Sequence, residues 1–222
     1  MKFGSRTQEV RTSLTIHSGK TSLTADLVVP EHASGLVIFA HGSASSRFSP
    51  RNQFVASALN SKGLGSLLVD LLSQVEEHHD TASGEHRFDI DFLSERLVAV
   101  IDAMVVDENT KGLRIGLFGA STGAAAALVA AERRSKFVSA VVSRGGRVDL
   151  AADVFEDVHA PTLLIVGAND QDVLKLNQEA VLLLACAKHL AVIDGAAHLF
   201  EEPGSLEQVA HLAQDWFAKY LK

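Results

Sequence analysis

The stretch "LFGASTGAAAAL", residues 117–128, is the most informative part of this sequence about the fold. An apolar run reaches Gly119, Ser121 follows between two glycines, and a run of alanines suited to a helix comes after Gly123. Glycines on both sides of a serine permit a sharp turn from a buried strand into a helix and let the two pack closely. The pattern predicts either a structural strand-to-helix turn or a nucleophilic serine presented on one.

Similar apolar runs recur along the chain, and most are separated by segments long enough for a helix. Runs this apolar are typical of strands buried on both faces of a parallel sheet. Before them, two alternating runs in "SLTIHSGKTSLTADLVV" flank a Ser-Gly-Lys turn and predict a β-hairpin. We therefore expect an α/β fold with a mostly parallel sheet, an N-terminal antiparallel hairpin and helices on both faces. The predicted strands after the hairpin are 35–41, 65–71, 113–119, 137–143, 162–167 and 189–195.

Local signals predict where several helices begin and which face they bury. Ser49 before Pro50 is typical of a helix start, and Ser205 with Gln208 three residues later resembles a capping box. Gly63 is placed where the first of these helices should end. Helical spacing predicts one apolar face over residues 93–104. The core side of the last helix is predicted to hold Val209, Leu212, Trp216, Phe217 and Tyr220.

Composition and charge argue against several classes of function. The 222 residues fit one domain spanning 1–222, and a net charge of −7 argues against a general nucleic-acid binder. The chain has a single cysteine, Cys186, which excludes an internal disulfide and a thiolate metal cluster and is expected to be a core thiol. No apolar run is long enough for a signal peptide or a membrane span, so a soluble, cytoplasmic protein is expected. No feature indicates an oligomeric state.

Polar residues that can carry out acyl chemistry follow three of the predicted strands. Ser121 comes after 113–119, Asp170 and Asp172 follow 162–167, and His198 follows 189–195. Ligands bind at the carboxyl ends of the strands in such sheets. A serine needs a base to accept its proton, and histidine needs a carboxylate to fix its tautomer. The order nucleophile, acid, histidine predicts a catalytic triad at one sheet edge.

An acyl-transfer site also needs N–H donors for the oxyanion that develops on the substrate. The amide of Thr122, at the start of the helix after the nucleophile, is one expected donor. The second is expected from the loop after "HG" at 41–42, at Ser43. The chemistry uses side chains and backbone alone, so we expect no cofactor. We also expect no metal site, because the polar segment with His78, His79 and His86 has no spacing fixed by a helix or turn; it is interpreted as a solvated, mobile loop.

The sequence resembles the α/β-hydrolases, and among them the small dienelactone-hydrolase-like enzymes. The resemblance covers nearly the whole chain and rests on "HGSASSRFSPRN" (41–52), "GASTG" (119–123), "GANDQDV" (167–173) and "GAAHLFEEPG" (195–204). It implies an α/β-hydrolase fold with Ser121 as nucleophile, Asp170 rather than Asp172 as acid, and His198 as base. Dienelactone hydrolases proper use a cysteine nucleophile, so serine here argues against dienelactone as the substrate. Lids of this fold follow the strand matching 137–143, where only 144–161 is available, so no large cap is expected.

Arginines near the predicted site have two interpretations. Arg47 and Arg51 flank the "HG" loop, while Arg144 and Arg147 follow strand 137–143. They could simply solubilise the rim or pair with carboxylates such as Asp149. Alternatively Arg47, Arg51 and Arg144 bind an anionic substrate.

The sequence thus leads to two hypotheses about function. The first is a serine hydrolase that cleaves a small ester, lactone or thioester through an acyl-enzyme. The second is a non-catalytic module of the same fold that binds a ligand or partner, since relatives of this kind also occur beside phosphoribosyltransferase domains. The intact set of triad residues favours the hydrolase.

Overall fold

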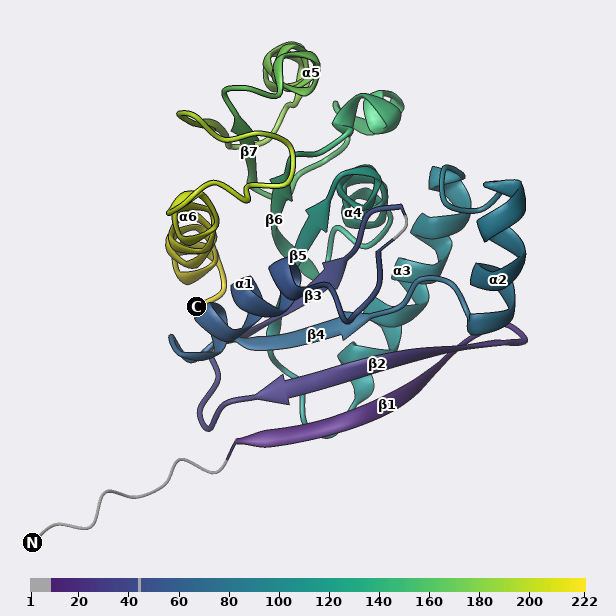
Figure 1. Cartoon of the computed structure of the whole chain (residues 1–222). Helices are drawn as coiled ribbons and strands as arrows, with labels where there is room; N and C mark the ends of the chain where they lie inside the picture. Colours follow the sequence, from purple (N-terminus) through teal and green to yellow (C-terminus); the bar gives the residue numbers. More distant parts are fainter. Residues whose placement is uncertain (1–8, 44) are drawn as a thin grey trace, which may run out of the picture.

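The computed structural model describes residues 9–43 and 45–222, and these residues are built around one eight-stranded sheet (Figure 1). The strand order is β1-β2-β4-β3-β5-β6-β7-β8. β1 and β2 form the antiparallel hairpin, β2 pairs antiparallel with β4, and the pairs from β4 to β8 are parallel. The predicted mostly parallel sheet with an N-terminal hairpin is confirmed. The strands are β1 (Val10–Ser18), β2 (Thr21–Val29), β3 (Gly35–Ala40), β4 (Gly65–Val69), β5 (Arg114–Ala120), β6 (Val138–Arg144), β7 (Thr162–Gly167) and β8 (Lys188–Ile193).

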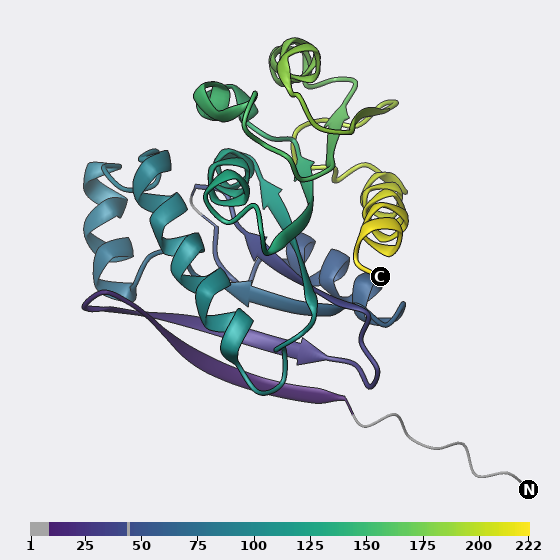
Figure 2. The ribbon, with the colours of Figure 1, turned by 180° about the vertical axis from the view of Figure 1, so that it is seen from behind.

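Helices cover both faces of the sheet, as Figures 1 and 2 show from opposite sides. One face carries α1 (Pro50–Asn60) and α6 (Ser205–Tyr220), and its core contains Phe39, Phe118 and Phe217. The other face is covered by α3, α4, α5 and a short 3-10 helix, η1. Every residue of α4 from Thr122 to Ala131 is buried, because small alanines let this helix lie directly on the sheet. The bounds are α2 (Gln74–Ser83), α3 (Ile90–Val106), α4 (Thr122–Arg133), α5 (Gln171–Leu183) and η1 (Val148–Val154).

The predicted helix start at Ser49 and the predicted apolar faces are confirmed. The Ser49 hydroxyl accepts the Asn52 N–H at the start of α1. In α3, the buried apolar residues recur with helical spacing from Leu93 to Met104. In α6, Val209 and Phe217 are fully buried, and Leu212, Trp216 and Tyr220 pack against the same core.

The segment 72–90 differs from the expected loop, because it contains the helix α2. The Ser73 hydroxyl accepts the Glu76 N–H, and the Glu76 carboxylate accepts the Ser73 N–H, so this is a true capping box. Two ion pairs hold the segment: Arg96 Nη2 of α3 lies 2.6 Å from Glu76 Oε1, and Arg87 Nε lies 2.6 Å from Asp80 Oδ2. The helix carries no apolar stripe, which is why hydrophobic periodicity does not predict it.

The capping box expected at Ser205 is wrong. Helix α6 begins at Ser205 itself, and Gly204 occupies the N-cap position with a φ of 82°. Glycine is the residue that adopts this left-handed conformation at no steric cost, so it turns the chain into the helix. The Gln208 side chain donates to the Gly204 carbonyl, at 3.3 Å, rather than back to a serine cap.

No large cap covers the carboxyl ends of the strands in the described part of the chain. The connection from β6 to β7 contains only η1, as expected from its length. Within residues 9–43 and 45–222, no helix combines the length and the apolar character needed to cross a membrane.

Candidate active site

Ser121 lies at the sharp turn between β5 and α4. Its backbone has φ 51° and ψ −122°, outside the regions that non-glycine residues prefer. The Ser121 N–H donates to the Arg144 carbonyl at 3.2 Å, and the Ser121 carbonyl accepts the Arg147 N–H at 3.1 Å. A conformation of this kind costs about 1–3 kcal/mol and persists where the surroundings enforce it. The turn therefore presents Ser121 at the carboxyl edge of the sheet.

Gly123 allows α4 to approach the neighbouring strand β3. A Cβ atom at this position would lie 2.2 Å from the Ala40 carbonyl oxygen and 2.5 Å from that of His41. We expect Gly123→Ala to lower the free energy of unfolding by about 2–4 kcal/mol, measured by urea denaturation, because backbone atoms must move. Gly65→Ala is the control, since its nearest contact would be 3.3 Å and its loss should be smaller. Equal losses would mean that α4 can shift freely on the sheet.

His198 and Asp170 meet on the loops after β8 and β7. His198 Nδ1 lies 2.6 Å from Asp170 Oδ2, and their side chains are 38% and 15% exposed. The two loops are tied together because the Asn169 N–H donates to the Ala196 carbonyl and the Asn169 side chain donates to Gly195. A proton on Nδ1 directed at the carboxylate leaves Nε2 of the ring as a proton acceptor.

Asp172 is exposed and lies in the first turn of α5. It does not cap this helix, because α5 begins at Gln171 and Asp170 occupies the N-cap position. The Asp170 carboxylate makes no capping hydrogen bond and contacts His198 instead.

Backbone contacts connect the serine to the histidine. Arg144 accepts the Ser121 N–H, and a Cβ on the next residue, Gly145, would lie 3.4 Å from Cε1 and Nδ1 of His198. The chain at 144–145 therefore contacts both the Ser121 backbone and the His198 ring. Among the described residues, no hydrogen bond joins the Ser121 hydroxyl to His198.

The loop after β3 passes directly beside Ser121. A Cβ on Gly42 would lie 2.9 Å from Ser121 Cβ. The Ser43 N–H donates to the Thr122 hydroxyl at 3.1 Å, so it already has an acceptor in this structure. Thr122 is the first residue of α4, and its own N–H therefore has no acceptor within the helix.

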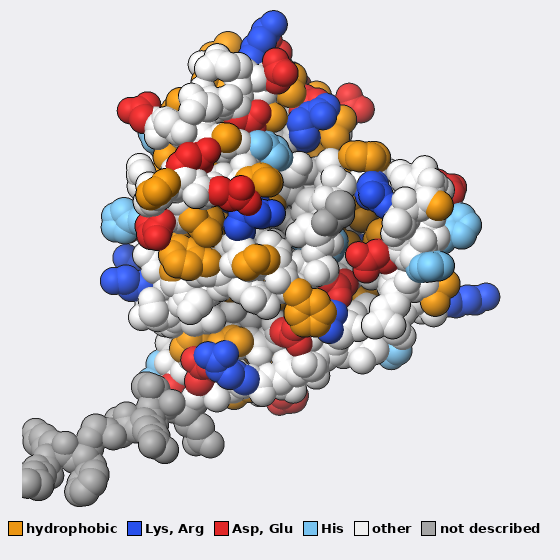
Figure 3. Space-filling model, in the orientation of Figure 1, with side chains coloured by type: hydrophobic (Ala, Val, Ile, Leu, Met, Phe, Trp, Pro, Cys, Tyr) orange, Lys and Arg blue, Asp and Glu red, His pale blue; other side chains and the backbone are white. Residues whose placement is uncertain are grey.

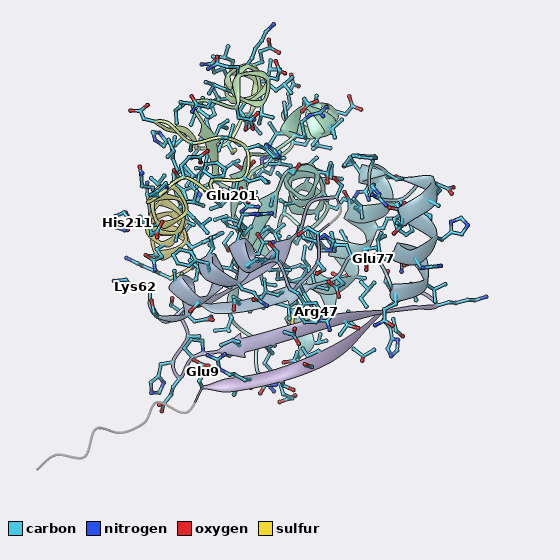
Figure 4. All side chains as sticks on the ribbon, viewed as in Figure 1. Glu9, Arg47, Lys62, Glu77, Glu201 and His211 are labelled. Atoms are coloured by element: carbon cyan, nitrogen blue, oxygen red, sulfur yellow. The ribbon has the colours of Figure 1, made fainter. Side chains whose placement is uncertain are left out.

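A cavity of about 260 Å³ opens between this loop and α2. Figure 3 shows a hollow in this part of the surface, and Figure 4 shows Glu77 reaching toward it from α2. Its lining includes His41, Ser43, Asp70, Glu77 and Arg87. The His41 ring holds the loop, because its Nε2 accepts the Leu71 N–H at 3.2 Å. The sequence analysis did not predict that residues of α2 line this cavity. The one local signal for this helix is the capping box formed by Ser73 and Glu76.

Three of the four arginines form ion pairs with carboxylates, and two of these, Arg47 and Arg147, make two such contacts each. Arg47 forms ion pairs with Asp26 and Asp70, and Arg147 forms a bidentate pair with Asp149. Figure 4 places Arg47 beside β2 and β4, away from Glu201 near α6. Because Asp26 and Asp70 compensate the Arg47 charge, this guanidinium is less available to a substrate anion than that of Arg144.

Arg144 is 8% exposed, and no described residue accepts a hydrogen bond from its side chain. Burial, together with the positive charge of Arg51, lowers the pKa of the Arg144 guanidinium to about 10. The group still carries its charge at neutral pH. Arg51, in the first turn of α1, donates from Nη1 to Glu201 Oε1 at 3.0 Å, while its Nε is buried without a partner.

The buried charge of Arg144 should destabilise the protein. Its pKa is lower in the folded chain than the ordinary value of an arginine, so the unfolded chain holds the proton more tightly. We expect Arg144→Met to raise the melting temperature by about 2–6 °C, since methionine fills similar space without a charge. Thermal unfolding followed by circular dichroism measures this. A lower melting temperature would show that Arg144 supports the fold.

Among the described residues, no group of three or more histidine, cysteine or acidic side chains is arranged to hold a metal ion.

Comparison with known proteins identifies the fold and the family. No protein-family model matches the chain. The chain is 49% identical to a dienelactone hydrolase from Anabaena variabilis, with a TM-score of 0.95 over 97% of this chain and 100% of that one. The esterase Est1E from Butyrivibrio proteoclasticus shares the fold at 16% identity, with a TM-score of 0.78 over 93% of this chain and 98% of that one.

Curated relatives from two strains of Mycobacterium tuberculosis, provisionally named as phosphoribosyl transferases, are 51% identical over 204 residues. The match covers 92% of this chain and 45% of theirs, so the chain spans less than half their length. The close likeness to the Anabaena structure over its full length shows that this chain belongs to the dienelactone-hydrolase-like family of α/β-hydrolases.

Proposed function

We propose that this protein is a serine hydrolase that cleaves a small ester, lactone or thioester through an acyl-enzyme on Ser121. The observation that carries the proposal is the 2.6 Å contact between His198 Nδ1 and Asp170 Oδ2, at the sheet edge where the β5–α4 turn presents Ser121. A histidine held in this tautomer has a free Nε2 for the serine proton.

The proposed reaction follows from these positions. The Ser121 hydroxyl turns toward His198, gives its proton to Nε2 and attacks the carbonyl carbon of the substrate. The tetrahedral intermediate collapses, and His198 returns the proton to the leaving alcohol or thiol. Water, activated by the same nitrogen, then releases the acid from the serine. Catalytic hydrogen bonds often form only when the substrate is bound. The proposed reaction therefore begins with a rotation of the Ser121 side chain toward His198.

The oxyanion is proposed to bind the N–H groups of Thr122 and Ser43. The Thr122 N–H stands at the amino end of α4, where the helix dipole also favours negative charge. The Ser43 N–H donates to the Thr122 hydroxyl without substrate, and it must share or exchange that acceptor for the oxyanion. The cavity beside Ser43 and α2 is the proposed place for part of the substrate.

Two measurements test the proposal. A short nitrophenyl ester should give a burst of nitrophenol followed by steady turnover, and a fluorophosphonate should add one adduct to the intact protein. Digestion and mass spectrometry should locate the adduct on Ser121. Binding of esters without turnover, and no adduct, would contradict the proposal.

A second candidate function is a non-catalytic accessory module. The observation that favours it is that the longer mycobacterial relatives are named as phosphoribosyl transferases. It requires no chemistry at Ser121, so the adduct and the burst distinguish the two candidates.

A further inference from the structure

The guanidinium of Arg144 is a buried positive charge with no counter-charge. Its Nε and Nη1 atoms are shielded from solvent and have no hydrogen-bond partner among the described residues. Leaving such a group unpaired is costly, and buried charges in native proteins are usually paired. A missing anionic partner therefore explains Arg144 better than a structural role does.

A second cation lies beside it. β6 alternates its side chains, and Arg144 is on the same face as Val142, which packs in the core under α1 and α6. On that face, Arg51 stands in the first turn of α1 and is close enough to lower the pKa of Arg144. The first turn of α1 contains no acidic residue, so the amino end of this helix adds further positive potential.

Two carboxylates, Glu201 and Glu202, follow His198 in the chain, and neither forms an ion pair with Arg144. Glu202 Oε1 accepts the Ala197 N–H at 3.1 Å, and Glu202 Oε2 is buried without a hydrogen-bond partner among the described residues. Glu201 contacts Arg51 only, and its side chain is 66% exposed, so this pair is weak and exchangeable. Figure 4 places Glu201 between α1 and the start of α6.

This cation pair adjoins the proposed catalytic groups. The Arg144 carbonyl accepts the Ser121 N–H, and Gly145 abuts the His198 ring. A substrate whose reacting carbonyl lies at Ser121 can therefore extend a second group toward Arg144.

We propose that Arg144 and Arg51 bind an anionic group of the substrate, a carboxylate or a phosphate, and that Glu201 occupies Arg51 until this group replaces it. The inference rests on the proposed ester hydrolysis and specifies the substrate class of that site. Guanidinium groups suit both anions, since their planar donors match the oxygen atoms of either.

Matched esters measure the preference. Monoethyl adipate carries a carboxylate, ethyl 4-phosphonobutyrate carries a phosphonate, and ethyl hexanoate is neutral; hydrolysis of each can be followed in a pH-stat. The wild-type protein should favour one of the anionic esters, which also identifies the anion. Arg144→Met should lower kcat/KM for that ester by about 10- to 150-fold, with little change for ethyl hexanoate.

Two further variants sharpen the test. Glu201→Gln frees Arg51 and should raise kcat/KM for the anionic ester by about two- to fivefold. Arg134→Met is the control, because that guanidinium lies at the carboxyl end of α4, the end away from Ser121, and pairs with Asp102 of α3; it should leave the preference unchanged. Equal losses on charged and neutral esters in Arg144→Met would overturn the proposal.

Binding without turnover separates this inference from the proposed function. Ser121→Ala protein should show a higher melting temperature with monoethyl adipate or inorganic phosphate, and the double variant with Arg144→Met should show no such shift. If neutral esters are hydrolysed while neither anion shifts the melting temperature, the anion site is wrong and the hydrolase stands. If the anions bind but no ester is cleaved, the hydrolase is wrong and the anion site stands.

Discussion

Ser121→Ala should lower kcat for a short nitrophenyl ester by about 10⁴-fold or more, the loss typical of removing a triad nucleophile. The reason is that the β5–α4 turn presents Ser121 at the sheet edge, whereas the neighbouring Thr122 is buried and its hydroxyl accepts the Ser43 N–H. The Ser121 hydroxyl makes no hydrogen bond to a described residue, so alanine should fold normally. Steady-state kinetics on protein with an unchanged circular dichroism spectrum measures the effect.

Ser143→Ala is the matched control for this variant. Ser143 is fully buried at the end of β6, two residues before Gly145, and its hydroxyl also has no described partner. Removal of this hydroxyl should change kcat by less than about twofold, because Ser143 takes no part in the proposed reaction. Fluorophosphonate labelling of Ser121→Ala at the wild-type rate would show that another residue is the nucleophile.

Asp170→Asn should be nearly as damaging, with a fall in kcat of about 10⁴-fold. An amide side chain can donate to Nδ1 and thereby favours the tautomer that places the proton on Nε2, the atom that must accept it. The Asp170 side chain is only 15% exposed and lies 2.6 Å from His198 Nδ1, so solvent cannot replace it easily.

Asp172→Asn removes the same charge two residues away and serves as the comparison. Asp172 is exposed on α5, so its kcat should stay within about threefold of wild type. A larger loss in Asp172→Asn than in Asp170→Asn would reassign the acid. Both variants should be compared at the same pH.

Much of the fold can be predicted from the sequence, because apolar runs indicate buried strands and glycines indicate tight turns at the positions where they stand. Gly119 and Gly123 predict the turn at Ser121, and the order of strands and loops brings Asp170 and His198 to one edge. These three residues of the candidate site can be predicted because each follows directly after a strand that the apolar runs indicate.

Features that depend on long-range ion pairs could not be predicted in this way. Helix α2 has no apolar stripe and is secured by pairs such as Glu76 with Arg96, which is 20 residues away. The arginines illustrate the same limit: Arg47 is compensated by Asp26 of β2 and by Asp70 directly after β4, whereas no described residue compensates Arg144. Sequence position puts both near the site, but only packing decides which charge remains unpaired.

The two ends of the described chain lie at the edge of the sheet opposite Ser121. Leu221 is fully buried beside Gly35 at the start of β3, where a Cβ on the glycine would lie 2.7 Å from Leu221 Cβ. At the same edge, Val10 pairs with Val29, and the neighbouring Val28 pairs with Ser66 at the start of β4. A reporter protein or a solid support attached next to Val10 or Lys222 would therefore face away from Ser121 and the proposed active site, so the immobilised protein should accept substrate as freely as the protein in solution.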